Sequence, residues 1–533
     1  MERICRRTTI FFLFLMLGML VAVLSVFTIA SGTGLAQTAE QQSSFRLEAA
    51  RTRGAIYDCK LRGLTGQETE YAAAIVPTIE GAAALSKVLP QEKMAEIYPT
   101  MTAGKPFALR VKDSFSAEGA DVFPIEKRYR DSQTAVHVLG YLDGSGAGVS
   151  GIEKLFDRQL TENQGRITAT YKVDAMNRVL AGEEKKINDT SFLQRRGVVL
   201  TLDQEIQKAA EAALKKYLKK GAVVVTEAPS CKIRAIASAP DFNPNDVAAV
   251  LEDTDAPLLN RAFSAYSVGS VFKLVSAAAA LEYGISPDTR YTCTGGIQVS
   301  DGIFHCYGGE SHGEEDMCRA IAQSCNTYFV HVMQQAPQSQ FLLTAQNLGF
   351  GSGVEVAPGF STAAGNLPTL DSLKIPKALA NFSFGQGDLT ATPVQIAGMV
   401  NAIASGGQYT PPTLYEGFVN ENLQYIEQAK APETRRVMTQ HTASLLRSFM
   451  VQSIEDGTSR KFKPASGGAG AKTATAQTGI FVDGVEKVIS WVAGYYPQEE
   501  PRYVITVVGE DGTGGGATCG PVFKEIADAL PLD

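Results

Sequence analysis

The sequence predicts a multidomain protein of mixed helix and strand (an α/β or α+β fold), preceded by a transmembrane helix. The chain has 533 residues, and a single hydrophobic core rarely serves more than roughly 300 residues. An uncharged apolar run begins at residue 10. Strand-like runs occur near residue 200 and again near the C-terminus, on either side of a helical middle. We therefore expect a large domain whose central antiparallel sheet is flanked by helices and completed by both ends of that domain.

Composition excludes several classes of protein. Hydrophobic residues make up 44% of the chain and charged residues 20%, which argues against a disordered protein. The net charge is −7 and no long basic tract occurs, so no nucleic-acid partner is expected. Eight cysteines without a C-x-x-C motif do not suggest a disulfide scaffold or a zinc ribbon. We expect no cofactor and no metal.

The apolar run at residues 10–30 predicts a membrane anchor. At ~1.5 Å per residue, a helix of this length spans a ~30 Å hydrocarbon core. Arg3, Arg6 and Arg7 precede the run and should stay in the cytosol, which places the rest of the chain outside a plasma membrane crossed once. A cleaved signal peptide ending near Gly34-Leu35-Ala36 is the alternative, but its apolar region is usually only ~7–15 residues long. Both interpretations export the rest of the chain.

Patterning then divides the chain into segments. A polar Gln/Ser/Thr-rich stretch follows the apolar run, a charged region with mixed patterning comes next, and regular patterning starts near Gly197. The predicted segments are a cytoplasmic N-terminus (1–9), a transmembrane helix (10–30), a linker (31–50), an irregular α+β region (51–195) and the large domain (196–533).

The elements of the large domain can be read in order. Asp203 is a suitable N-cap for a helix with apolar residues at helical spacing, and Gly284 is a suitable helix end. Asp483-Gly484 and the segment 497–501 provide turns between three late strands. The expected elements are a strand at 198–202, a helix to about 219, paired strands at 222–226 and 233–237, a helix at 271–282, strands at 472–480, 488–495 and 503–508, and a closing helix at 521–530.

One S-x-x-K motif, Ser270 to Lys273, lies where a turn gives way to the helix at 271–282. Side chains three apart on a helix are neighbours, so the lysine can approach the serine hydroxyl. A lysine with a lowered pKa can activate a serine nucleophile, and the helix N-terminus offers N–H groups to an oxyanion. On its own the motif is weak, because an exposed serine and a solvated lysine at this spacing arise by chance.

Two further motifs follow. Ser324-Cys325-Asn326 is an S-x-N motif whose hydroxyl and amide can lie on one side of a short loop. Lys472 opens a predicted strand, where it can add positive charge, and Thr473 and Thr475 can hydrogen-bond a substrate carboxylate. Each motif alone has a plain structural explanation. The ordered set of S-x-x-K, S-x-N and K-T on a strand is much more specific, and it matches the active-site serine β-lactamases and penicillin-binding proteins.

The chain resembles class B penicillin-binding proteins, which are peptidoglycan D,D-transpeptidases, over nearly its whole length. The region before residue 196 is too short for the glycosyltransferase domain that class A members have. It resembles the non-catalytic pedestal or dimerisation-type domain of the class B proteins. The resemblance rests on the three motifs and on these further stretches: Arg53-Gly54-Ala55-Ile56-Tyr57-Asp58, residues 137–141, residues 148–153, residues 200–203 with Gln207, Phe384-Gly385-Gln386-Gly387, residues 392–395 and residues 491–495.

The resemblance implies a role for each motif residue. Ser270 would attack the penultimate D-alanine carbonyl of a peptidoglycan stem peptide ending in D-Ala-D-Ala, with Lys273 as base. Ser324 would relay the proton and Asn326 would hold the acyl amide. The backbone N–H groups of Ser270 and Thr475 would bind the oxyanion, and Lys472, Thr473 and Thr475 the terminal carboxylate. β-Lactam antibiotics and a polytopic glycosyltransferase are the further partners that it implies.

Three positions depart from the family pattern. Ala474 replaces the usual glycine of the third motif, and its methyl group is expected to crowd the substrate strand if it faces the cleft. Val268 stands where proline is usual, and Cys59 where arginine is usual. Two alternatives stay open: a β-lactamase, and a β-lactam sensor or scaffold with a degenerate site. The anchor and the extra region argue against the first, and the intact Ser270 and Lys273 against the second.

Cysteines and histidines crowd one segment around the second motif. A disulfide, free thiols and a metal site are all compatible with Cys293, Cys306, Cys318, Cys325, His305 and His312. Irregular spacing and an extracytoplasmic location favour a disulfide. We predict a Cys306–Cys325 bond that limits activity by displacing Ser324 or Asn326. The alternative is that Cys325 is only a small packing residue, with Cys293 as the rival partner of Cys306. Elsewhere, Glu153 and Asp157 are paired carboxylates at helical spacing, which we interpret as a solvated helix face.

Overall fold

The computed structural model describes residues 2–31, 43–162, 164–180, 182–482, 484–510 and 512–532. The chain forms two compact units that alternate along the sequence. The first contains residues 1–53, 69–127 and 164–194, and the second contains residues 54–68, 128–163 and 195–533. This grouping differs from a single boundary between 195 and 196, because strand β2 (Ala55–Tyr57) pairs with strand β8 (Gly197–Leu200) in the second unit.

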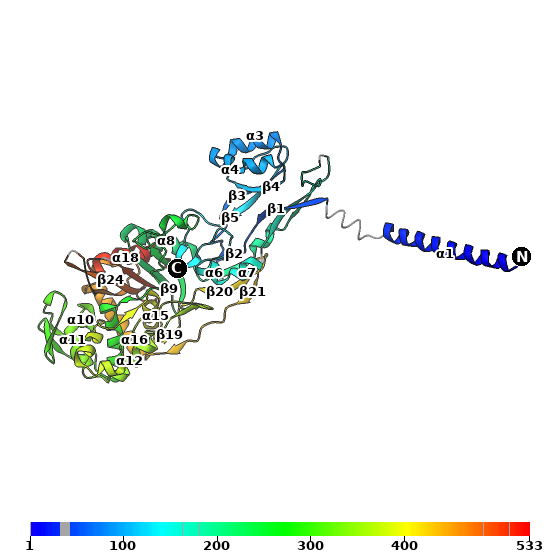
Figure 1. Cartoon of the computed structure of the whole chain (residues 1–533). Helices are drawn as coiled ribbons and strands as arrows, with labels where there is room; N and C mark the ends of the chain where they lie inside the picture. The colour runs from blue at the N-terminus through cyan, green and yellow to red at the C-terminus, as the bar shows by residue number, and fades with distance from the viewer. Residues whose placement is uncertain are drawn as a thin grey trace. The chain divides into compact units, whose positions relative to one another are not determined.

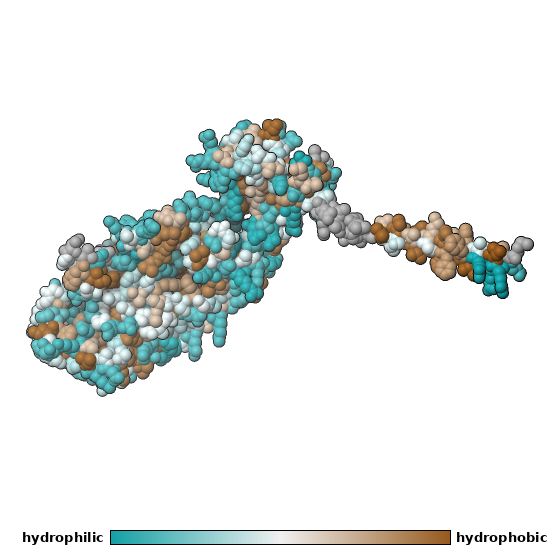
Figure 2. Space-filling view, viewed as in Figure 1, coloured by the Kyte–Doolittle hydropathy of each residue, from teal (hydrophilic) through white to brown (hydrophobic). Residues whose placement is uncertain are grey.

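The first unit begins with helix α1 (Glu2–Ser31), which is fully exposed and apolar along most of its length. Figure 2 shows its hydrophobic residues in brown and hydrophilic residues at its N-terminal end in teal. Among the residues described, α1 is the one helix long and apolar enough to cross a membrane, with a mean hydropathy of 2.9. It fits the single-pass anchor expected at 10–30 and begins several residues earlier.

Two small sheets and two helices complete the first unit. Strand β1 (Ser44–Arg51) pairs antiparallel with β6 (Arg166–Lys172). The predicted linker at 31–50 is therefore wrong over its last residues, because Phe45 and Leu47 alternate with charged residues and pack against a buried cluster; residues 32–42 lie outside the described part. The remaining elements are β7 (Lys186–Asp189), β3 (Glu68–Ile75), β4 (Phe107–Val111), β5 (Ala120–Lys127), α3 (Ile79–Val88) and α4 (Gln91–Thr102).

A five-stranded antiparallel sheet forms the centre of the second unit, as expected (Figure 1). The outer strands of the order β10-β9-β25-β24-β23 come from opposite ends of the domain, and the late strands join the early pair where β25 pairs with β9. Its members are β9 (Gly221–Glu227), β10 (Lys232–Ala239), β23 (Gly470–Val482), β24 (Val485–Tyr496) and β25 (Tyr503–Gly509).

Helices bury both faces of this sheet. On one face, α8 (Gln204–Tyr217) and α18 (Gly520–Ala529) share a core with alternate residues of the strands, and the side chain of Asp203 accepts a hydrogen bond from the Glu205 N–H at the start of α8. On the other face lie α9 (Lys273–Tyr283), α15 (Pro393–Ala404) and α16 (Gln440–Asp456). Side chains alternate between the two faces along the strands, apart from register shifts at Ile233/Ala235 and Gln477/Phe481, and this alternation explains why both faces are apolar.

A second sheet of this unit has the order β2-β8-β20-β21, with β20 (Tyr415–Val419) and β21 (Tyr425–Gln428). Helices α6 (Gly151–Leu155) and α7 (Asp157–Glu162) belong to the same unit. The solvated face expected for Glu153 and Asp157 is wrong. Glu153 is fully buried and accepts hydrogen bonds from Arg128 and Tyr129, and Asp157 accepts one from the Gly148 N–H. These carboxylates are structural.

In the sequence, a helical region with short hairpins lies between the early strands of the central sheet (β9 and β10) and its late strands (β23 to β25). Strand β12 (Tyr291–Cys293) pairs with β15 (Gly313–Glu315), and β13 (Gly296–Val299) pairs with β14 (Gly302–His305). The helices are α10 (Met317–Ala322), α11 (Asn326–Met333), α12 (Gln338–Asn347), α13 (Leu370–Leu373) and α14 (Pro376–Ser383). This region places the second motif against α9.

Candidate active site

Ser270 lies on a tight 3₁₀ turn (Gly269–Phe272) that runs directly into α9. In a 3₁₀ turn the side chains at i and i+3 are eclipsed, so Lys273 reaches back over the serine. Its Nζ lies 2.9 Å from Ser270 Oγ. The turn requires Gly269, whose φ is +63°. The predicted helix therefore forms and ends at Gly284 as expected, with its first turn tightened at the nucleophile.

Two remote segments hold this turn in place. The Gly269 N–H donates to the carbonyl oxygen of Gly385, at 2.9 Å. A Cβ at Gly385 would lie only 2.0 Å from the Gly269 carbonyl oxygen, so the close approach requires glycine. The indole Nε1 of Trp491 donates to the Ser267 carbonyl oxygen at 2.9 Å. The stretch 384–387 and the strand after the third motif thus position the nucleophile turn.

The second motif lies in the loop between α10 and α11. Ser324 has a φ of +62°, which is uncommon for a residue with a side chain. This conformation directs both its hydroxyl and its carbonyl oxygen toward Lys273, whose Nζ lies 3.1 and 2.7 Å from them. Asn326 begins α11, and its Oδ1 lies 2.6 Å from the same Nζ. The two motifs therefore meet at one buried amine.

The third motif approaches from β23. Lys472 Nζ donates to Ser324 Oγ at 3.0 Å and to the Thr473 carbonyl oxygen at 2.9 Å. Ser324 Oγ therefore lies between the two lysines. All three motifs, 202 residues apart at their extremes (472 − 270), form one connected network in the second unit.

Burial tunes the charge of both lysines. Desolvation lowers the pKa of Lys273 to about 7, although the nearby thiols of Cys325 and Cys306 act in the opposite direction. Desolvation also lowers the pKa of Lys472, and the neighbouring charge of Lys273 adds to the effect. A neutral lysine amine has a lone pair that can accept a proton, so Lys273 is suited to the role of base near neutral pH.

The network opens into a cleft of about 940 Å³ lined by Ser270, Ser324, Asn326, Thr473 and Thr475. The lysines lie beneath its floor, since both are fully buried. One wall comes from the 384–387 stretch and another from Gly514–Gly516, a loop that the motifs did not predict.

The two threonines have different surroundings. Thr473 Oγ1 donates to the hydroxyl of Thr458 at 2.9 Å, a partner that carries no recognisable sequence signal. Thr475 Oγ1 accepts from the Gly515 N–H at 3.2 Å, so its own proton is free to point into the cleft. Thr475 thus offers a hydroxyl donor at the mouth of the site, which a bound carboxylate can accept, whereas Thr473 must turn its proton away from Thr458 to do the same.

The methyl group of Ala474 is only 3% exposed and belongs to the hydrophobic core. It lies 3.3 Å from the position that a Cβ at Gly269 would occupy, so it packs beside the nucleophile turn. Ala474 lines the cleft but exposes little surface to it, so crowding of the substrate by this residue stays a prediction.

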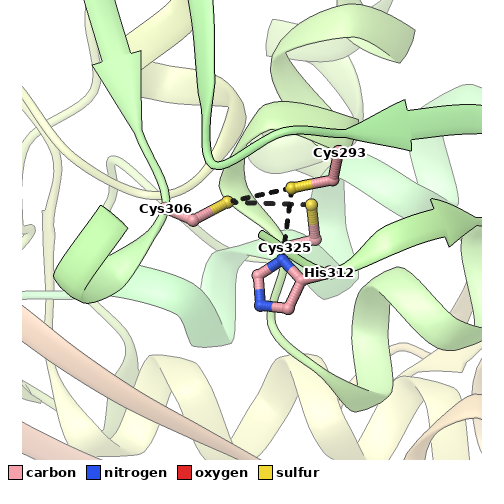
Figure 3. Close-up of side chains that lie close together, drawn as sticks. All are labelled: Cys293, Cys306, His312 and Cys325. Carbon is pink, nitrogen blue, oxygen red and sulfur yellow. Dashed lines mark hydrogen bonds between the residues drawn. The ribbon is translucent and has the colours of Figure 1, made fainter. Parts of the chain in front are cut away.

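The cysteines of this region gather beside the second motif. Cys306 Sγ lies 3.8 Å from Cys325 Sγ and 3.7 Å from Cys293 Sγ, and all are free thiols in this structure. The predicted Cys306–Cys325 pair is therefore adjacent and unbonded. His312 joins the group, whereas Cys318 and His305 do not (Figure 3).

Known proteins resemble this chain in sequence. Residues 221–528 match the family described as the penicillin-binding protein transpeptidase domain. The peptidoglycan D,D-transpeptidase PbpA of Mycolicibacterium smegmatis is 30% identical over 357 residues, which cover 62% of this chain and 72% of that protein.

Solved structures share the fold. Penicillin-binding protein 3 of Mycobacterium tuberculosis, complexed with ampicillin, has a TM-score of 0.66 at 23% identity and covers 91% of this chain and 95% of that one. A peptidoglycan synthase complex that coordinates polymerization and crosslinking has a TM-score of 0.69 at 24% identity, with 98% of both chains covered. With the family model matching more than half of its length, the chain belongs to the penicillin-binding protein transpeptidase family, and its resemblance to the class B members is confirmed.

Proposed function

We propose that this protein crosslinks peptidoglycan as a D,D-transpeptidase that works through an acyl-serine intermediate. One observation carries the proposal: a single buried amine, Lys273 Nζ, lies within 3.1 Å of Ser270 Oγ, Ser324 Oγ and Asn326 Oδ1. This is the geometry that activation of a serine by a lysine base needs. The name of the M. smegmatis relative, a peptidoglycan D,D-transpeptidase, supports the same reaction.

In the first half-reaction, Ser270 Oγ attacks the carbonyl carbon of the penultimate D-alanine while its proton passes to neutral Lys273. The negative charge that develops on the carbonyl oxygen is stabilised by the backbone N–H groups of Ser270 and Thr475. The C–N bond then breaks, and the departing D-alanine amine takes a proton delivered through Lys273 and Ser324. The product is an ester between Ser270 and the stem peptide.

In the second half-reaction, an amine of a neighbouring peptidoglycan strand attacks this ester and releases Ser270 with its proton. Asn326 holds the amide of the acyl group in both steps. Lys472, Thr473 and Thr475 hold the terminal carboxylate of the donor. Substrate binding is thus assigned to the rim of the cleft, and proton transfer to the buried floor.

In this proposal β-lactams inhibit the same site. Ser270 attacks the lactam carbonyl and the ring opens, but the amine that would leave stays covalently attached to the acyl group and remains in the cleft. The structural neighbour from M. tuberculosis was solved with ampicillin. Polymerization and crosslinking are coupled in the neighbouring synthase complex, and a polytopic glycosyltransferase is the partner we assign to this chain. Helix α1 anchors the protein uncleaved, with its N-terminus in the cytoplasm.

The test is labelling of the full chain with a fluorescent penicillin, followed by mass spectrometry of its peptides. The adduct is expected on the peptide that contains Ser270, and Ser270→Ala should remove it. Ser352→Ala changes an exposed serine outside the cleft and serves as the control, with labelling unchanged. An adduct that persists in Ser270→Ala contradicts the proposal, and rapid turnover of nitrocefin would instead indicate a β-lactamase.

A further inference from the structure

Three thiols and one imidazole converge on a single point beside the active-site cleft. Cys293 ends β12, Cys306 follows β14, His312 precedes β15 and Cys325 precedes α11. Figure 3 shows the four side chains pointing toward one another from these separate segments. Their ligand atoms all lie within 4.8 Å of one another, and the three cysteines are buried. None of the four is needed by the proposed acyl-transfer chemistry.

Three of the six separations between these atoms are close to the edges of a coordination tetrahedron, and the other three are at most 4.8 Å. Sulfur atoms bound at ~2.3 Å to one tetrahedral zinc ion lie about 3.8 Å apart, and a bound imidazole nitrogen lies about 3.6 Å from each sulfur. The observed Cys293–Cys306 and Cys306–Cys325 sulfur separations are 3.7 and 3.8 Å. His312 Nδ1 lies 3.3 Å from Cys293 Sγ. A disulfide would require ~2.05 Å between two sulfurs, and it would draw two members out of this array.

The three buried thiols share one side-chain hydroxyl and otherwise face backbone N–H groups at the start of α11. The Thr327 hydroxyl is 3.2 Å from Cys293 Sγ, 3.4 Å from Cys325 Sγ and 3.7 Å from Cys306 Sγ, and one hydroxyl has only one proton to donate. The Tyr328 N–H, 3.4 Å away, donates to Cys325 Sγ. A cation at the centre would bind all three sulfurs at once, in place of the weak S–H hydrogen bonds that the thiols can share with one another and with His312.

We propose that Cys293, Cys306, His312 and Cys325 bind one divalent metal ion, and that Zn²⁺ is the ion the site selects. Thiolate and imidazole ligands in a tetrahedral arrangement favour zinc over the harder cations, which prefer oxygen. Binding releases the thiol protons to solvent, so three thiolates and a neutral imidazole hold the ion. All four positions are filled by protein, which makes this a structural site with no position open for substrate.

The site bears directly on the second motif. Cys325 is the middle residue of Ser324-Cys325-Asn326, so a metal–sulfur bond fixes the loop that contacts Lys273. Ser324 needs such support, because its left-handed conformation is one that its side chain disfavours. A further link comes from Asn326, whose Nδ2 donates to the His305 carbonyl oxygen at 2.9 Å, next to Cys306. Removing the ion should therefore loosen Ser324 and Asn326 together.

The first measurement is the metal content of the full chain, purified in detergent with a reductant and without chelator, by inductively coupled plasma mass spectrometry. About one zinc per chain is expected. Cys306→Ser and His312→Ala should lose it, whereas His312→Cys should retain it as a four-cysteine site. Cys318→Ser is the matched control, because Cys318 lies in the same segment outside the cluster, and its zinc content should equal that of the wild type.

Cobalt substitution gives a readout that does not depend on purification history. Co²⁺ bound to the wild-type chain should show thiolate-to-metal charge-transfer absorption with the intense visible bands of a tetrahedral ion, and the Cys306→Ser chain should lack them. Substoichiometric zinc in the wild type together with a featureless cobalt spectrum overturns the proposal. A Cys306–Cys325 disulfide in a non-reducing peptide map of the wild type also overturns it, and would instead support the predicted redox control.

The effect on the second motif rests on the proposed function, and its test is separate. Chelation of the wild type should slow fluorescent penicillin labelling, by ~10²-fold if the loop shifts by ~1 Å, and added Zn²⁺ should restore it. Cys318→Ser should respond in the same way as the wild type. Bound zinc with labelling that ignores chelation leaves the metal site standing and refutes its support of Ser324. Absence of labelling under every condition refutes the proposed function instead.

Discussion

Lys273 is the residue on which the chemistry depends, and its properties arise from burial. It is fully buried under the cleft, where it contacts four oxygen atoms from Ser270, Ser324 and Asn326. Desolvation by this burial lowers its pKa to about 7, so a substantial fraction is neutral at physiological pH. A solvated lysine at the same spacing would be almost entirely protonated and unable to accept a proton.

The β-lactam acylation rate is therefore expected to rise with pH and level off. Below a pKa of about 7 the base is protonated, and the rate should fall roughly tenfold per pH unit. Above it the rate should reach a plateau. Stopped-flow measurement of acylation between pH 5 and 9, a range of about two units on either side, checks this.

Lys273→Arg should lower the plateau rate by ~10²–10⁴-fold, because arginine stays protonated. Lys374→Arg, at an exposed lysine paired with Asp371, is the control and should keep the wild-type profile. A rate that is flat across this range in the wild type would mean that another group is the base.

At the scale of single residues, the sequence predicts the reactive residues well. It predicts poorly the residues that hydrogen-bond to them or form the walls of the cleft. Ser270, Lys273, Ser324, Asn326 and Lys472 belong to ordered motifs, and the structure brings them together. Thr458 and the Gly514–Gly516 wall meet the site only through the path of the chain, so no spacing identifies them. The burial of Ala474 depends on how a strand packs against a turn, which the motif does not contain.

Among the elements, those with strong local signals were predictable. The late strands have apolar residues on both faces, and the caps of α8 and α9 carry Asp203 and Gly284. Strand β1 was missed because it follows a polar stretch, although Phe45 and Leu47 alternate as a strand requires. The burial of Glu153 was missed because its partner Arg128 is 25 residues away in the sequence.

The approach of the 384–387 stretch to the nucleophile turn leads to a prediction at the scale of elements. Gly385→Ala would place a methyl group 2.0 Å from the Gly269 carbonyl oxygen, so the turn must move. We expect penicillin labelling to fall by ~10²-fold or more, as for a ~1 Å displacement of a reacting group. Gly385 is remote in sequence from Ser270, so a loss of labelling in a folded variant reports on positioning.

Gly284→Ala supplies the matched control for that variant. Both glycines have positive φ, +88° for Gly385 and +97° for Gly284, so alanine strains the backbone at either position by about 1–2 kcal/mol. No atom lies within 4 Å of a Cβ at Gly284. Thermal unfolding of Gly284→Ala should report this strain alone, and that of Gly385→Ala should add the cost of the contact with Gly269. At a temperature where both variants are folded, only Gly385→Ala should lose labelling. Equal labelling in both would show that the contact with Gly269 is not needed.

At the scale of the whole molecule, the site and the anchor belong to different compact units. All motif residues lie in the second unit, and α1 lies in the first. Every described residue of α1 is exposed, and no other described residue covers its apolar surface. Such a surface is costly in water, so insertion into a bilayer is the arrangement that stabilises it. Release of the protein from membranes should accordingly require detergent and not salt.

The orientation of α1 can be measured with its own cysteine. Cys5 is exposed at the N-terminal end of the helix, beside Arg3, Arg6 and Arg7. Arginines flanking a span are retained on the cytoplasmic side, so a membrane-impermeant maleimide should modify Cys5 only after spheroplasts are permeabilised. The Cys5→Ser variant measures how much maleimide reacts with the other cysteines, and this amount is subtracted. Adding Glu500→Cys, at an exposed turn after β24, to that variant gives a site that should react in intact spheroplasts. Modification of Cys5 in intact cells would place the N-terminus outside and contradict the assigned topology.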